Sequence, residues 1–347
     1  MASFRTRRVT SMLSERADLQ RVGLDDGSRA YNLVRLTGQV AVGDEVVVNT
    51  TAVALGLGTG GWHIVHWNLA NRELDLDGGG HIMKLRYTSL QTDVGSVGER
   101  ADDPTQSSLG TELAGIPVIV CGLHSQMAVV AATFAHLKPQ ARLVYVMTDG
   151  AALPLALSDL AAELRRRELL RATVTCGHAF GGDFEAVTVA SALTAARQLA
   201  RADAIVVAMG PGVVGTATAL DTSALEAGPI LDTVAALGGI PIFCIRASTA
   251  DPRERHRGIS HHVLTVLERF VHCRVTVAVP TGVAPRSLPD VLSAHDVVFV
   301  DEVPVPGDVL DGLGLQVTTM GRSAAHDPLF FSFAAAAGTL AARILDD

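Results

Sequence analysis

The chain has 347 residues, of which 48% are hydrophobic and 18% charged, and its formal net charge is −8 at pH 7. This composition provides for a large core and excludes long disorder, and the acidic charge with only 4% aromatic residues argues against a nucleic-acid-binding protein. The N-terminus has no apolar leader, no uncharged run approaches the ~20 residues of a membrane span, and the four cysteines lack metal-site or redox spacing. We therefore expect a cytoplasmic protein with reduced thiols and no membrane partner.

Residues 30–95 alternate short apolar runs with glycine-rich turns and show no long helical period. Examples are Glu45-Val-Val-Val-Asn-Thr50 and Trp62-His-Ile-Val-His-Trp67. This alternation predicts a small β-barrel or sandwich domain. We place an N-terminal extension at residues 1–29 and a linker at residues 96–110, where Gly, Ser and Pro are frequent.

From residue 111 to residue 347 the pattern changes to runs that are apolar throughout and are separated by helical stretches. Such runs predict a doubly wound, mostly parallel, Rossmann-like sheet with helices on both faces. The segment Phe330–Ala337 suits helix packing, either in a homodimer or on its own sheet. The predicted strands are 116–121, 142–147, 172–176, 204–209, 240–245, 275–279 and 297–300, with 315–319 as a weaker eighth.

The most polar loop follows the run 240–245. Residues 246–257 contain four arginines and two acids. Ser260 occupies an N-cap position, so the two histidines behind it should open a helix, whose N-terminus favours neutral imidazole. Neutral imidazole accepts protons or binds metals, and guanidinium groups bind carboxylate or phosphate; a solvated charge patch is the alternative. The candidate catalytic residues here are His256, His261 and His262, and the candidate anion-binding residues are Arg246 and Arg255.

A glycine loop, Gly210-Pro-Gly-Val-Val-Gly215, follows the strand 204–209 and formally matches G-x-G-x-x-G. NAD(P) is disfavoured, because Gly228-Pro229 breaks the helix that should follow and the next strand does not end in an acidic residue. A loop whose peptide N–H groups hold an anion is compatible with the sequence, as is a plain tight turn. The candidate anion-binding residues are Gly210, Gly212, Gly215 and Thr216.

Other predicted strands also end in polar loops, and ligands bind beyond the carboxyl ends of parallel strands. Asp149 and Asp183 are the expected carboxylate partners of the histidines in proton transfer. The sequence leaves a divalent metal ion open, although His256-x4-His261-His262 matches no zinc pattern and adjacent histidines at a helix start rarely face one ion. The candidate metal ligands on neighbouring loops are His124, His178 and Glu185.

Several longer strings carry a resemblance: GHIMKLRYTSLQ, MTDGAALPLALS, GHAFGGDFEAV, GPGVVGT, RHRGISHH, and TTMGR followed by DPLFF. On the basis of these strings, the chain resembles the bacterial family catalogued as domain of unknown function 3866. The resemblance extends from about Val40 to Leu340. The resemblance implies Gln at the position of His178, which argues against a catalytic or metal role for that residue. It implies no activity, substrate or cofactor.

From the residues we expect an enzyme, a hydrolase or group-transfer enzyme acting on a small metabolite that carries phosphate or carboxylate. Arginines would hold the anion, the glycine loop would bind a phosphate or an oxyanion, and a histidine would move protons. A non-catalytic sensor of the same ligand and a structural homo-oligomer are the alternatives.

Overall fold

The computed structural model describes residues 2–57, 60–99, 110–285 and 288–346. The chain divides into two compact units, Met1–Gly95 and Ser96–Asp347. Most of the expected linker, 96–110, falls on residues 100–109 and so lies outside the described residues.

The first unit is a closed barrel with the strand order β1-β2-β3-β5-β4. Its neighbouring strands are antiparallel except for the parallel pair β3 and β5. Valine and leucine side chains such as Val22, Leu24 and Val46 fill the interior. The elements are β1 (Phe4–Arg16), β2 (Leu19–Leu24), β3 (Arg29–Leu33), α1 (Val34–Thr37), β4 (Glu45–Asn49), α2 (Thr51–Ala54), β5 (Trp62–Asn68) and the hairpin strands β6 (Ile82–Lys84) and β7 (Thr92–Val94).

The placement of residues 1–29 in an extension was wrong, because β1, β2 and the first residue of β3 belong to the barrel. β1 is 13 residues long and pairs with both β2 and β4, yet only Val9 is buried along it. A strand that exposes nearly all its side chains, several of them arginines, gives little apolar alternation for a sequence pattern to detect.

The second unit is built on an eight-stranded, all-parallel sheet in the order β11-β10-β9-β12-β8-β13-β16-β17. The central strands are buried on both faces, which accounts for their uninterrupted apolar sequences. The strands are β8 (Pro117–Cys121), β9 (Leu143–Thr148), β10 (Ala172–Thr175), β11 (Phe184–Glu185), β12 (Ala204–Met209), β13 (Ile240–Cys244), β16 (Thr276–Pro280) and β17 (Asp296–Val300).

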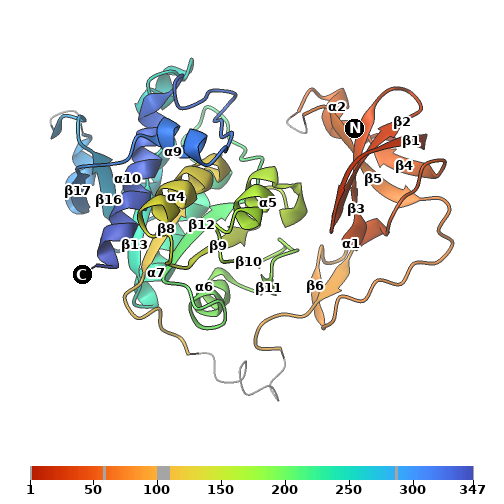
Figure 1. The fold of residues 1–347 in the computed structure, drawn as a ribbon, viewed down its shortest axis with the longest axis horizontal. Helices are drawn as coiled ribbons and strands as arrows, with labels where there is room; N and C mark the ends of the chain where they lie inside the picture. The colour runs from red at the N-terminus through yellow and green to blue at the C-terminus, as the bar shows by residue number, and fades with distance from the viewer. Residues whose placement is uncertain (1, 58–59, 100–109, 286–287, 347) are drawn as a thin grey trace. The chain divides into compact units, whose positions relative to one another are not determined.

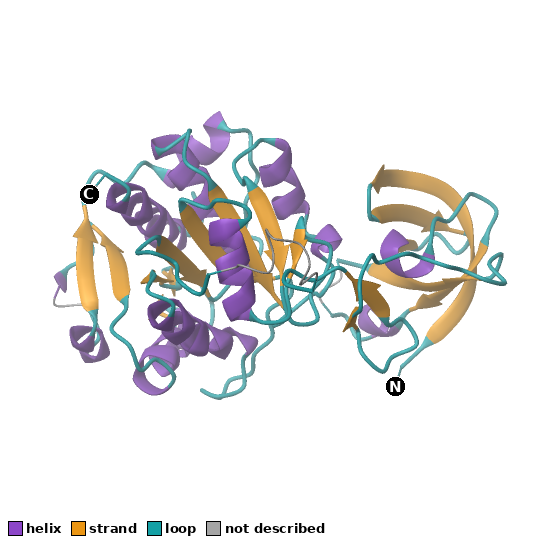
Figure 2. Ribbon diagram, turned by 90° about the horizontal axis from the view of Figure 1, so that it is seen from below, coloured by secondary structure: helices purple, strands orange, loops and turns teal. Residues whose placement is uncertain are grey.

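Helices cover both faces of this sheet, as expected for a doubly wound fold (Figure 2). One core cluster joins the sheet to α4 (His124–Leu137), α5 (Asp159–Arg166), α9 (Pro306–Gly312) and α10 (Pro328–Ile344), with α4 and α10 side by side (Figure 1). The other joins it to α6 (Val189–Gln198), α7 (Ala227–Ala236) and α8 (His261–Arg269). The short elements are η1 (Leu155–Leu157), η2 (Ser223–Glu226), β14 (Ala247–Ser248), η3 (Glu254–His256), β15 (Gly258–Ile259) and η5 (Asp290–Ala294).

One expectation within this unit needs correction. The eighth strand of the sheet is the short β11, whereas residues 315–319 form no strand. The segment Phe330–Ala337 lies within α10, and most of its side chains are buried against the sheet and α4, the second of the two packing arrangements that we expected for it. Among the described residues, no helix combines the length and the apolar character that a membrane span requires.

Candidate functional site

Three neighbouring strands, β12, β8 and β13, deliver the glycine loop, the start of α4 and the arginine–histidine loop to one edge of the sheet. The three strands are parallel, so their carboxyl ends lie together. The chain runs from β8 to β9 on one side and later to β13 on the other, so the strand order reverses at β8. A crevice at such a reversal is the usual ligand site of a doubly wound sheet.

A cavity of about 340 Å³ opens at this reversal. Its walls include the glycine loop from Pro211 to Thr216, two arginines and three histidines, and residues 318–320 from the segment before α10. The volume is at the lower end of the range for small-ligand sites, which is about 300–1,000 Å³. The lining polar side chains from the arginine–histidine loop are Arg246, Arg253, His256 and His262.

The glycine loop lies directly against the histidines. A Cβ atom at Gly215 would come within 3.2 Å of Cε1 of His262 and 2.9 Å of Oγ1 of Thr222. Gly212 has φ of +102°, a conformation open chiefly to glycine. The chain behind the loop stays irregular until η2 begins at Ser223, so no helix N-terminus faces the glycines as it does in a dinucleotide fingerprint.

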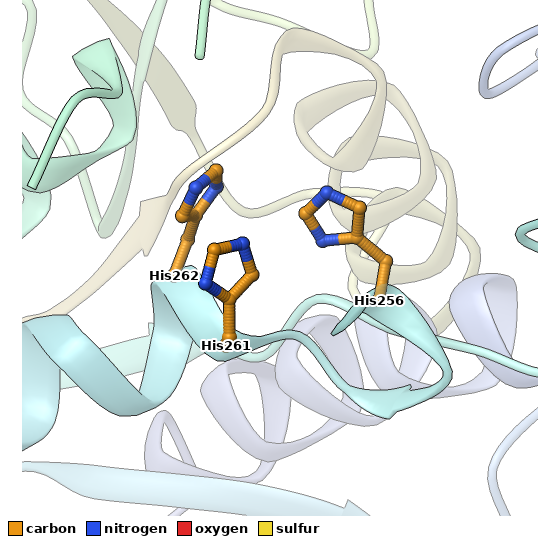
Figure 3. A group of neighbouring side chains, drawn as sticks. All are labelled: His256, His261 and His262. Carbon is orange, nitrogen blue, oxygen red and sulfur yellow. The ribbon is translucent and has the colours of Figure 1, made fainter. Parts of the chain in front are cut away.

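The three predicted histidines form one cluster (Figure 3). His261 and His262 open α8, and His256 approaches them from the end of η3. One ring nitrogen from each lies within 4.8 Å of the others, and the ring centroids of His261 and His262 are 4.0 Å apart. Adjacent histidines at a helix start rarely face one ion, but here α8 presents both rings to the same side.

A hydrogen bond orients one of these rings. Ser260 Oγ lies 2.8 Å from Nδ1 of His256, and it makes no N-cap hydrogen bond to α8 although it occupies that position. Nε2 of His261 and Nε2 of His262 are buried and have no hydrogen-bond partner among the described residues.

The electrostatic environment keeps all three imidazoles neutral. Burial, with Arg246 and Arg253, lowers the pKa of His256 to about 3. Burial, with the neighbouring His261 and Arg246, lowers the pKa of His262 to about 4. The pKa of His261 is lowered by burial and then by Arg255. At neutral pH each ring therefore retains a lone pair that can accept a proton or bind a metal ion.

A network of buried charges supports the arginine wall of the cavity. Asp251 and Asp327 are fully buried. Arg253 forms two hydrogen bonds of 2.9 Å to Asp251, which hold the pKa of that carboxyl well below its usual range. Arg246 contacts Asp251 at 3.3 Å, and Arg322 bridges Asp251 and Asp327 at 3.5 and 3.1 Å.

The network leaves positive charge at the cavity. Three guanidinium groups face two carboxylates, which gives a net charge of +1. Arg255 adds to it, because it lowers the pKa of His261 and its buried Nε has no hydrogen-bond partner among the described residues. Arg255 does not itself line the cavity. Positive charge beside a loop of peptide groups is an environment that favours an anion.

The acidic residues expected as proton-transfer partners are not brought to the cavity. Asp149 accepts a hydrogen bond from the backbone N–H of His178 at 2.8 Å. Asp183 accepts hydrogen bonds from the backbone N–H and the hydroxyl of Thr173 and pairs with Arg165. Because Thr173 lies near the amino end of β10, Asp183 stands away from the carboxyl edge.

The expected metal ligands outside the cluster also have structural partners. Glu185 accepts hydrogen bonds from the Thr175 hydroxyl and the Gly181 N–H, both at 2.7 Å, and so ties its loop to β10. His124 lines the cavity, but its Nδ1 lies 3.0 Å from the Met209 carbonyl and its Nε2 lies 2.7 Å from the Ser158 hydroxyl. Neither ring nitrogen of His124 is left for a metal ion.

The sequence reasoning missed the carboxylates that organise the site and one unusual glutamate. Asp251 lies inside the arginine–histidine loop, and Arg322 and Asp327 belong to the strings TTMGR and DPLFF. The residues were therefore visible in the sequence, but nothing in the sequence indicated that they pair with one another. Glu226 ends η2, where the Thr148 hydroxyl donates to it at 2.6 Å. Burial, opposed by the Thr148 hydrogen bond and assisted by Asp149, raises the pKa of Glu226 to about 7.

Fold and site together define an α/β protein with a Rossmann-like sheet, a small barrel ahead of it, and a polar cavity at the strand-order reversal. The chain belongs to the family described as "Protein of unknown function (DUF3866)", which matches residues 29–338. A search of the curated proteins finds no match to the sequence.

Proposed function

We propose that this protein is an enzyme, a hydrolase or a group-transfer enzyme, that acts on a small metabolite carrying phosphate or carboxylate. The observation that carries the proposal is the shared cavity, in which Arg246, Arg253 and the Gly210–Gly215 loop lie beside two neutral histidines. The guanidinium and peptide N–H groups would bind the anion, and the neutral imidazoles supply the lone pairs that proton transfer or metal binding requires.

The geometry favours Arg246 as the principal anion contact. The only hydrogen bond of its guanidinium group within the described residues runs from Nη2 to Asp251 at 3.3 Å, whereas Arg253 is held by two shorter bonds to the same carboxylate. Asp251 would keep Arg253 and Arg322 if Arg246 were removed. Substitution of Arg246 therefore removes a cation from the cavity with the rest of the network in place.

Binding of inorganic phosphate, measured by isothermal titration calorimetry, is the first test. Arg246→Met should weaken phosphate binding about tenfold or more, because a hydrogen bond to a charged group contributes about 1.5–3 kcal/mol. Arg274→Met is the matched control: Arg274 pairs with Asp296 at the amino ends of β16 and β17, away from the cavity.

Turnover is the second test. Phosphorylated and carboxylated metabolites that raise the melting temperature of the protein would be incubated with it, and products would be identified by mass spectrometry. Product formation that is lost in Arg246→Met supports the enzyme. Tight, Arg246-dependent binding with no product from any bound metabolite would instead establish a sensor, and absence of anion binding would contradict both.

A further inference from the structure

The histidine cluster has the composition of a metal site. Three imidazole nitrogens, one each from His256, His261 and His262, lie within 4.8 Å of one another. Nitrogens bound to one tetrahedral zinc ion at about 2.0–2.1 Å lie about 3.4 Å apart. Small rotations of the three rings would bring the nitrogens to that spacing. We infer that these three histidines bind one divalent transition-metal ion of the zinc type, with an open coordination position for a ligand held in the cavity.

Two nitrogen atoms without partners point independently to a ligand. Nε2 of His261 and Nε2 of His262 are buried and lack a hydrogen-bond partner among the described residues. A buried polar atom that stays unsatisfied is destabilising, so two of them in adjacent rings are an unfavourable arrangement in the protein alone. A metal ion bound between the rings would satisfy both lone pairs at once.

The hydrogen bond at His256 is of the kind that metal-binding histidines make. Such a histidine usually donates its second ring N–H to an oxygen, which fixes the tautomer and the ring orientation. The Ser260 hydroxyl lies 2.8 Å from Nδ1 of His256 and engages that nitrogen. Nε2 of His256 therefore remains for a metal ion, as does the unpartnered Nε2 of His262.

The ligand atoms and the surrounding charge indicate which ion would bind and what would fill its open coordination position. Nitrogen-only coordination suits zinc, cobalt, nickel or copper, whereas magnesium and calcium prefer oxygen. The lowered pKa values of all three rings remove proton competition for the metal at neutral pH. The nearby arginines repel a cation, and this cost is reduced when an anion fills the open position. Metal and anion binding should therefore strengthen each other.

Cobalt(II) added to chelator-treated protein is the direct probe, because its visible absorption reports nitrogen coordination. We expect one Co²⁺ per chain, displaced by one Zn²⁺, with an affinity that increases in the presence of inorganic phosphate. His261→Ala and His262→Ala should each weaken Co²⁺ binding at least tenfold. The control is His272→Ala, an exposed histidine beyond the opposite end of α8.

The outcomes separate this inference from the proposed function. His261 is only partly buried, so its alanine variant should keep the wild-type melting temperature without metal. Failure of folded wild-type protein to bind Co²⁺ or Zn²⁺ stoichiometrically overturns the metal site, as does binding that survives both substitutions. Phosphate binding by metal-free protein would then still support the proposed function. Metal binding with no anion binding would support this inference alone.

Discussion

Two groups of loops at the strand ends contain similar polar residues but use them differently. After β10, Asp183 in the loop and Glu185 in β11 make their hydrogen bonds to Thr173, Thr175 and the loop backbone. After β12 and β13, in contrast, the glycine loop and the histidine cluster line a cavity and leave two buried nitrogens without partners among the described residues. A polar residue at a strand end indicates a binding site only when its donors and acceptors are not already paired within its own loop.

The largest expected effect on stability comes from removing a buried charge of the second group, compared with a more exposed charge of the first. Asp251→Asn leaves Arg246, Arg253 and Arg322 without their shared carboxylate, and we expect a loss of about 3–5 kcal/mol in the free energy of unfolding. Asp183→Asn breaks an ion pair whose members are 36% and 40% exposed, and should cost about 1 kcal/mol or less. Urea denaturation of both variants measures the difference.

Equal losses in the two variants would show that the buried network is no more important to stability than the exposed loop. A smaller loss in Asp251→Asn than in Asp183→Asn would contradict the comparison outright.

The sequence predicted the α/β fold well because most of the buried strands are almost entirely apolar, a property local to a few residues. It did not predict β11, which is two residues long, or β1, which exposes its side chains. For the site, the order of strands and loops placed the glycines and histidines at one edge. The pairing of Ser248 with Asp327, 79 residues apart, depends on tertiary packing and leaves no periodic signal in the sequence.

The orientation of the histidine rings was likewise beyond a sequence argument. Adjacent residues on a helix differ in direction by about 100°, which predicts divergent rings. At the start of α8, however, the rings of His261 and His262 are neighbours. The hydrogen bond of Glu226 could not be predicted from the sequence either, because its partner Thr148 lies on a strand 78 residues away.

A second prediction concerns Glu226, a half-buried carboxyl that has no ion pair among the described residues. Its pKa is raised from 4.5 to about 7, chiefly by burial. The folded state therefore binds the proton more tightly than the unfolded state, and the associated stability is present below pH 4.5 and lost as the pH rises through 7. Glu226→Gln should be more stable than the wild type by about 3 kcal/mol at pH 8, and by about 1 kcal/mol at pH 5.

Urea denaturation at the two pH values tests this prediction. If the difference in the free energy of unfolding between the two proteins is the same at pH 5 and pH 8, Glu226 does not titrate in this range. Its carboxyl would then resemble that of Glu185, which is hydrogen-bonded within its own loop.

The smallest effect is expected at His124. This residue lies at the cavity wall, but both of its ring nitrogens are hydrogen-bonded, as the carboxylates of Asp183 and Glu185 are. Burial lowers its pKa to about 4, below the value of about 6.5 for an unfolded chain. The stability from neutral His124 is present above pH 6.5 and is lost as the pH falls toward 4. Between pH 7 and pH 5 the wild type should therefore lose about 2 kcal/mol more than His124→Gln does.

The difference in pH dependence, rather than the stability at one pH, is the quantity to measure, because His124→Gln also removes the contact with Ser158 at every pH. The contribution of Glu226, opposite in sign over this range, is common to both proteins and cancels. His136→Gln, on the exposed side of the same helix, is the control, since an exposed ring is hydrated in both folded and unfolded states. If His124→Gln and the wild type lose stability in parallel, His124 is already protonated or hydrated at pH 5, and one of its ring nitrogens is accessible from the cavity.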